Sequence, residues 1–289
     1  PDGSQKQLDQ THRYNFVNPK AGLFYDITNH INAYVSFAVG HREPTRANFE
    51  DAVGDPLREP KREILYDYEA GWRFVTSKLF CSANLYYMDY VDQIIPTGEK
   101  NSVGYDIMTN VPESYRLGIE LSGGVTVANK LSFSTNITLS RNKIRNFTQW
   151  AAFYDENWDE QYLPVLLGET DIAYSPALSG SFILQWKAFK NFTAAWTAKY
   201  VGAQYFDNTM SQNRKLDPYF LNNLQFDYVI ITGKKGEIAL RLAVNNIFDV
   251  KYSSNAYGGL WYEQGTEQTW AYYYPQAGIN FLGGLSLKF

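Results

Sequence analysis

The chain has 289 residues, a formal net charge of −4 and a single cysteine, Cys81. This length allows one large domain or two small ones, the lone cysteine excludes an intrachain disulfide, and the mild charge argues against a nucleic-acid partner. Aromatic residues make up 17% of the chain, which is typical of β-structure or of a membrane–water interface, and no apolar stretch is long enough for a transmembrane helix.

Apolar and polar residues alternate along most of the chain, and this period of two predicts β-strands. In residues 31–40, for example, Ile31 and Val35 fall on one face, whereas Asn32 and Ser36 fall on the other. The same pattern recurs with only short interruptions. In chain order, eleven strands are expected, at residues 13–26, 31–42, 62–75, 79–94, 112–127, 131–146, 174–187, 192–206, 218–231, 237–249 and 273–289.

Short and long connections alternate between these strands. The short ones, which are rich in Asn, Gly and Lys, fall at residues 28–30, 76–78, 128–130, 190–191 and 232–236, and the long ones at 43–61, 95–111, 147–173, 207–217 and 250–272. Outer-membrane barrels show this order, with short periplasmic turns and long outer loops, and their strands need about 9–11 residues to cross the bilayer. The sequence therefore predicts an all-β, antiparallel transmembrane β-barrel rather than a soluble β-sandwich.

The end of the chain carries the most informative motifs. The last strand closes on Phe289, and a terminal Phe of this kind resembles the signal read by the barrel assembly machinery of the outer membrane. Residues 244–252, Val-Asn-Asn-Ile-Phe-Asp-Val-Lys-Tyr, resemble a segment near the end of TonB-dependent receptors. Four further segments resemble other strands of that family, in the expected order: residues 66–71, 87–90, 112–120 and 199–202. Residues 41–46 resemble the Bacteroidetes branch of the family.

By this resemblance the chain is identified as the C-terminal β-barrel half of a TonB-dependent receptor of the Bacteroidetes type. The resemblance implies a complete barrel of 22 strands that is filled by an N-terminal plug, and eleven strands make half of that barrel. No segment resembles the plug, so residues 1–289 are expected to form a single-domain fragment that begins in an outer loop near residues 1–12. The partners implied are TonB through the plug, the plug and the other barrel half, the assembly machinery through Phe289, outer-membrane lipid and, as a further candidate, a surface lipoprotein.

The resemblance implies a transport receptor in the outer membrane of a Gram-negative bacterium. Its cargo would be a scarce, large solute, with an iron–siderophore or related metal chelate as the first choice. Import of haem, cobalamin, a glycan or a peptide stays open, as do a passive porin and a surface-binding protein. No nucleophile, catalytic dyad or metal-ligand cluster stands out, and the three histidines lie far apart, so no enzymatic activity, resident metal or cofactor is expected.

Two groups of side chains are candidates for function. Aromatic residues interleaved with acids in the loops 147–173 and 250–272 could stack on a flat or chelated ligand, or could pack loop on loop and form an interfacial belt. This group is Trp150, Tyr154, Trp158, Tyr162, Tyr257, Trp261, Tyr262 and Trp270. In the second group, alternation points charged residues into the lumen, where those of the family face the plug. This group is Arg42, Asp67, Glu69, Arg73, Arg116, Glu120, Asp227 and Arg241.

Overall fold

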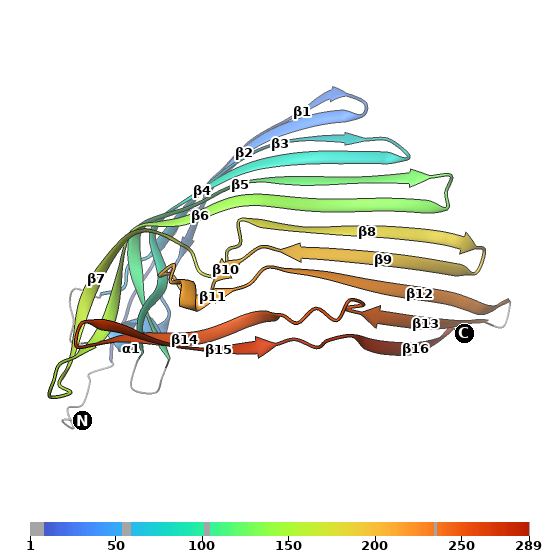
Figure 1. Cartoon of the computed structure of the whole chain (residues 1–289). Helices are drawn as coiled ribbons and strands as arrows, with labels where there is room; N and C mark the ends of the chain where they lie inside the picture. Colours follow the sequence, from blue (N-terminus) through green and yellow to red (C-terminus); the bar gives the residue numbers. More distant parts are fainter. Residues whose placement is uncertain (1–8, 54–58, 101–104, 234–235, 289) are drawn as a thin grey trace.

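A computed structural model describes residues 9–53, 59–100, 105–233 and 236–288, so Phe289 and residues 1–8, which belong to the expected start of the fragment near residues 1–12, lie outside it. The described chain forms one 14-stranded sheet and a two-stranded ribbon (Figure 1). The sheet contains β1 (Lys20–Thr28), β2 (Ile31–Arg42), β3 (Glu63–Val75), β4 (Leu79–Lys100), β5 (Asp106–Val127), β6 (Leu131–Tyr154), β7 (Glu160–Asp171), β8 (Leu178–Phe189), β9 (Phe192–Val201), β12 (Tyr219–Gly233), β13 (Gly236–Asn245), β14 (Ser253–Glu263), β15 (Thr266–Pro275) and β16 (Asn280–Lys288). The ribbon pairs β10 (Gln204–Tyr205) with β11 (Lys215–Leu216).

Eleven strands form the main path of the sheet, in the order β1-β2-β3-β4-β5-β6-β8-β9-β12-β13-β16. This path confirms the all-β, antiparallel fold expected from the sequence. The short turns gather at one end of the strands and the long connections at the other (Figure 1). Within the described residues, β1 pairs only with β2 and β16 only with β13, so the sheet is open.

The long connections contain more regular structure than the alternation indicated. β4, β5 and β6 run on into the segments expected as loops, and β7, β14 and β15 form there as additional strands. The connection after β2 holds a short helix, α1 (Arg46–Ala52), and the one after β9 holds a 3-10 turn, η2 (Gln212–Arg214), although the sequence showed no helical period. Among the described residues, no helix is long and apolar enough to span a membrane.

The strand expected at residues 273–289 is divided into β15 and β16, because the turn after β13 binds the chain between them. Asn246, which has a positive φ of 51° and is 4% exposed, bonds through its amide to the backbone of Val250 and to the Ala277 carbonyl. Asp249 accepts a hydrogen bond from the Ile279 backbone N–H at 2.9 Å. The motif at residues 244–252 is therefore a turn that fixes where the last strand begins.

Replacing Asn246 with alanine is expected to lower the free energy of unfolding by about 2–3 kcal/mol. The substitution strains the left-handed backbone and leaves partly buried backbone groups of Val250 without their side-chain partner. Asn129 is the matched control, since its φ is 55° but it lies exposed in the β5–β6 turn. Asn129→Ala should cost only the backbone strain, and denaturant unfolding of the two variants in lipid checks the difference. Equal losses would contradict the role assigned to the Asn246 amide.

The sheet has two faces of opposite character. We call one the apolar face, after a cross-strand row that runs through β4, β5, β6, β8, β9, β12, β13 and β16. The row consists of Leu79, Val125, Phe133, Leu184, Trp196, Leu224, Val244 and Phe281. We call the other the polar face, after a row through β1 to β6, β8 and β9 that consists of Asp26, Asn32, Arg73, Ser82, Ser122, Asn136, Ser181 and Lys199.

Tyrosine rings cover glycines on the polar face. A Cβ added at Gly118 would lie 2.4 Å from the Tyr86 hydroxyl oxygen and 2.7 Å from the Leu139 carbonyl oxygen. Gly118→Ala is therefore expected to destabilise the sheet by about 1–3 kcal/mol through overpacking. Gly123, five residues along the same strand, has its nearest such neighbour at 3.6 Å, so Gly123→Ala should be close to neutral. Denaturant midpoints measured side by side test this, and a similar loss for both would contradict it.

Candidate functional site

Aromatic rings mark the level at which the apolar face gives way to charged side chains. The rings of Phe37 and Tyr68 lie 4.9 Å apart, and Tyr87 and Tyr115 continue the row at 6.2 Å intervals. The Arg145 guanidinium lies 5.2 Å from the Tyr115 ring centre. Just beyond the row, ion pairs join Arg141 to Glu169 at 2.7 Å, Lys143 to Asp171 at 2.7 Å, and Arg145 to Glu113 at 3.1 Å. An apolar band edged by aromatic residues is typical of a β-sheet that spans a membrane.

All eight charged residues that alternation assigned to the lumen lie on the polar face. Three of them are ion-paired there in ways that the sequence did not reveal: Arg42 Nη2 lies 2.8 Å from Glu63 Oε2, and Arg241 Nε lies 2.6 Å from Asp227 Oδ1. Arg116 Nη1 donates to the Ser175 hydroxyl at 2.9 Å, and Glu120 accepts from the Asn84 amide at 3.4 Å. Arg73 is exposed, and no acidic side chain of the described residues lies within ion-pair distance of it.

The two aromatic-rich loops come together beyond the aromatic row. β6 and β7 form one hairpin, β14 and β15 form another, and β14 pairs in parallel with the end of β6 (Figure 1). The Phe153 and Tyr262 rings stack with their centres 4.4 Å apart and 8° between their planes. The Gln264 backbone N–H also donates to the Tyr154 carbonyl at 3.1 Å. The hairpins thus form one four-stranded extension of the sheet, in the order β7-β6-β14-β15.

Beneath this extension lies a cavity of about 510 Å³ at the long-connection end of the polar face. Seven parts of the chain contribute to its wall: β4, β5, β6, the β7–β8 connection, the segment before β11, β14 and β15. Arg116 and Tyr257 are the two residues from the sequence-based candidates that line it. The polar residues in the wall include Gln93, Gln149, Tyr174, Asp207, Asn208, Arg214 and Asn255.

Several of these polar side chains are buried against the cavity. Gln149, Asn208 and Arg214 are each 3% exposed. Arg214 Nη1 pairs with Asp207 at 2.9 Å, whereas its Nε has no hydrogen-bond partner among the described residues. A buried donor without a partner costs stability, and a bound acceptor would remove that cost. The wall therefore offers cationic and amide donors for an oxygen-rich ligand, beside the carboxylates of Asp106 and Asp207.

Tyr174 ties the cavity wall to β14. Its hydroxyl donates to Asn255 Oδ1 at 2.6 Å and also contacts the Ala256 carbonyl. Burial raises the pKa of the Tyr174 hydroxyl, so the phenol stays protonated at neutral pH and remains a donor. Ala256 also packs with Phe206 and Leu216, which fixes the segment that carries Arg214.

Most of the aromatic candidates lie on the opposite side of the extension. Gln149 faces the cavity, so alternation along β6 turns Trp150 and Tyr154 away from it, and cross-strand register places Tyr162 and Trp261 beside Ala152 on that outer side. Trp270 shares this side, Trp158 lies 66% exposed in the β6–β7 turn, and Tyr262 packs on Phe153. Burial and then Glu160 raise the pKa of Tyr162, so its exposed phenol is neutral at neutral pH.

Sequence reasoning missed Gln149, Asn208 and Arg214. Gln149 stands next to Trp150, and reading residues 147–154 as a strand would have separated the two side chains. Asn208 and Arg214 lie in a connection without a period. Asn208 is held by contacts with Ala173 and Pro96, and the segment of Arg214 packs against β14 through Phe206 and Leu216. No local signal in the sequence marks them.

These features define an antiparallel sheet of the membrane-spanning kind, with a cavity at the end where the long connections lie. A family model, TonB dependent receptor-like, beta-barrel, matches residues 2–247, and the chain belongs to this family. The catecholate siderophore receptor Fiu of Escherichia coli K12 is 21% identical over 262 residues, which cover 85% of this chain and 30% of that protein. The chain thus spans about a third of the length of the curated relatives it matches.

Solved structures of the same kind share the fold. The closed form of Fiu from E. coli K12 superposes with a TM-score of 0.65 at 18% identity, over 93% of this chain and 34% of that one. The siderophore receptor PiuA from Acinetobacter baumannii gives 0.70 at 16% identity, over 95% and 36%. The ferric enterobactin receptor PfeA from Pseudomonas aeruginosa, as a G324V mutant, gives 0.64 at 17%, over 94% and 40%.

Proposed function

We propose that this chain forms the C-terminal part of the barrel of an outer-membrane receptor that imports a ferric siderophore. The observation that carries the proposal is the cavity of about 510 Å³ at the outer end of the polar face in a barrel of this family. Its volume falls within the range of about 300–1,000 Å³ that is usual for small-molecule sites. The remaining wall would come from the plug and the other barrel half.

The chemistry of the cavity supports an anionic chelate as the ligand. Arg116 and the unpartnered Nε of Arg214 supply positive charge and donors, and Gln149 supplies a buried amide. The relatives named for catecholate siderophores support this class of cargo. Of the aromatic candidates, we propose that those on the outer side of the extension form an interfacial belt rather than the ligand site.

The partners follow from the same proposal. The exposed Arg73 and the half-buried Glu69 lie on the polar face, where a plug would supply partners for them, and that plug would engage TonB. Recognition of Phe289 by the barrel assembly machinery and an outer-membrane location belong to this proposal too. So do the origin in the Bacteroidetes branch, which rests on residues 41–46, and a surface lipoprotein partner.

Growth of a strain that lacks the gene for the full-length receptor tests the proposal. We expect the strain to lose growth on a ferric catecholate as its sole iron source and to regain it when the gene is restored. Cultures supplied with haem, cobalamin or a glycan serve as the alternatives. Loss of growth on one of those, with catecholate uptake intact, would contradict the siderophore assignment.

A further inference from the structure

The connection between β7 and β8 is fixed to several parts of the chain at the edge of the cavity. Its first residue, Ile172, is buried in an apolar cluster with residues of β4, β5 and β6. The Ala173 backbone N–H donates to Asn208 Oδ1 at 2.9 Å, and the Tyr174 backbone N–H donates to the Tyr205 carbonyl at 2.8 Å. The connection is therefore held by the barrel wall on one side and by the segment around β10 on the other.

Tyr174 has its backbone in the left-handed region. Its φ is 53°, a conformation that glycine adopts freely and that a bulky aromatic residue rarely adopts. Its side chain reaches β14, where the hydroxyl donates to Asn255 Oδ1 at 2.6 Å and contacts the Ala256 carbonyl. Strained residues persist only where surrounding contacts hold them, and they gather at functional sites. The contacts with β14 and with Tyr205 are the ones that hold Tyr174.

The next residue, Ser175, supports the arginine of the proposed binding site. Its hydroxyl accepts a hydrogen bond from Arg116 Nη1 at 2.9 Å and donates to the Ala173 carbonyl at 3.1 Å. The Tyr90 hydroxyl is a second hydrogen-bond partner of the Arg116 guanidinium. Arg116 and Tyr174 line the cavity, whereas Ser175 does not. Ser175 therefore supports the guanidinium from outside the cavity.

These contacts make the orientation of Arg116 depend on the backbone of Tyr174. The strain of a left-handed backbone and the net contribution of one hydrogen bond to stability are of comparable size. Loss of the Tyr174 hydroxyl would remove the bond to β14 and leave the strain, so the backbone would relax towards an unstrained conformation. The peptide group between Tyr174 and Ser175 would then rotate, and the Ser175 hydroxyl would move away from Arg116.

We propose that Tyr174 is a positioning residue for the ligand. By holding Ser175 in place, it orients the Arg116 guanidinium towards the oxygen atoms of a bound ferric chelate. Because Asn255 accepts the hydrogen bond from the Tyr174 hydroxyl, the same contacts make the orientation of Arg116 on β5 depend on β14. This inference rests on the proposed function, since it requires that Arg116 binds the chelate.

A double-mutant cycle on the full-length receptor, with the dissociation constant of a ferric catecholate as the readout, tests the proposal. We expect Tyr174→Phe and Ser175→Ala each to weaken binding about fivefold. Because both act through Arg116, adding either change to Arg116→Gln should weaken binding no further, whereas independent contributions would multiply. Ser175→Thr keeps a hydroxyl group and should bind within about twofold of the unmodified receptor.

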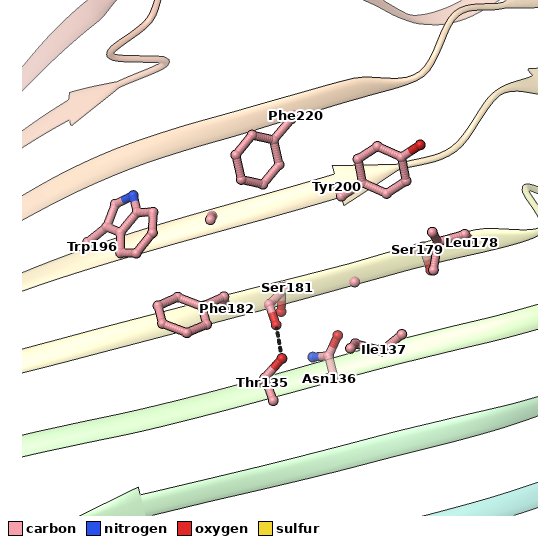
Figure 2. A pocket seen from close by; sticks show the side chains of 12 residues that line it. Thr135, Asn136, Ile137, Leu178, Ser179, Ser181, Phe182, Trp196, Tyr200 and Phe220 are labelled. Atoms are coloured by element: carbon pink, nitrogen blue, oxygen red, sulfur yellow. Dashed lines mark hydrogen bonds between the residues drawn. The ribbon is translucent and has the colours of Figure 1, made fainter.

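Two variants control for the loss of a hydroxyl group elsewhere on the sheet. Tyr200→Phe and Ser181→Ala change residues around a groove over β6, β8 and β9, and neither residue lines the cavity (Figure 2). Both variants should bind the chelate as the unmodified receptor does. Heat-modified mobility on gels confirms that each variant barrel is folded.

Two results would overturn the positioning role alone, provided that Arg116→Gln weakens binding. Losses that multiply in the double variants would mean that Tyr174 contacts the ligand itself. Full affinity in Ser175→Ala would mean that Tyr90 is sufficient to orient Arg116. Normal binding in Arg116→Gln would instead contradict the proposed binding site, and the positioning role with it.

Discussion

Placing an arginine at Leu121 is expected to lower the free energy of unfolding by about 2–4 kcal/mol, because this side chain faces hydrocarbon near the middle of the membrane-spanning band. Leu121 lies on the apolar face, 38% exposed, midway along β5 between Tyr115 and Val127. In a water-soluble sheet a side chain this exposed would accept arginine at little cost. The decrease in unfolding free energy therefore shows whether hydrocarbon or water surrounds the apolar face.

The adjacent residue supplies the control for this experiment. Ser122 belongs to the polar face, where it pairs with Ser82 and Asn136. Ser122→Arg adds the same side chain one residue along and should change the unfolding free energy by less than about 1 kcal/mol, since lumen positions tolerate charge. Denaturant unfolding in lipid vesicles and the yield in outer-membrane fractions measure both variants. Equal behaviour of the two would mean that the two faces meet the same solvent.

The membrane-spanning part of the fold could be predicted because its physics is local. Lipid on one side and a polar lumen on the other impose a period of two, so residues 31–42 and 79–94 reveal strands without knowledge of their neighbours. The division between β15 and β16 could not be predicted in this way. It depends on the hydrogen bond that Asp249 accepts from the Ile279 N–H across 30 residues, a contact that no local pattern specifies.

The same distinction between local pattern and long-range packing applies to the residues of the candidate site. Alternation along its own strand assigns Arg116 to the lumen, and in the structure Arg116 lies on the polar face. Alternation could not show that Arg214 is buried, because the segment that carries Arg214 has no period and is held by packing of Phe206 and Leu216 against Ala256. The aromatic loops were noticed for their composition, yet composition does not tell which rings face the cavity. That depends on β6 continuing as a strand through residues 147–154.

Replacing Arg116 with glutamine is expected to weaken binding of a ferric catecholate by roughly 10- to 100-fold. A hydrogen bond to a charged group contributes about 1.5–3 kcal/mol, and each 1.4 kcal/mol is about a factor of ten in affinity. Arg116 lines the cavity and is held at its edge by the Ser175 hydroxyl. Quenching of tryptophan fluorescence during titration of the purified full-length receptor gives the dissociation constant.

Two further variants distinguish binding in the cavity from binding elsewhere on the receptor. Arg241→Gln removes an arginine from the same polar face, but this one pairs with Asp227 away from the cavity, so binding should be unchanged. Trp158→Ala combined with Trp261→Ala removes two rings from the turn and the outer side of the extension, and we expect an effect of less than about threefold, since neither ring lines the cavity. If removing the two tryptophans weakens binding of the ferric catecholate and replacing Arg116 does not, the ligand binds on the outer side of the β6–β7 and β14–β15 hairpins. In that case the buried arginine and amide groups stabilise the junction of loops instead of holding the cargo.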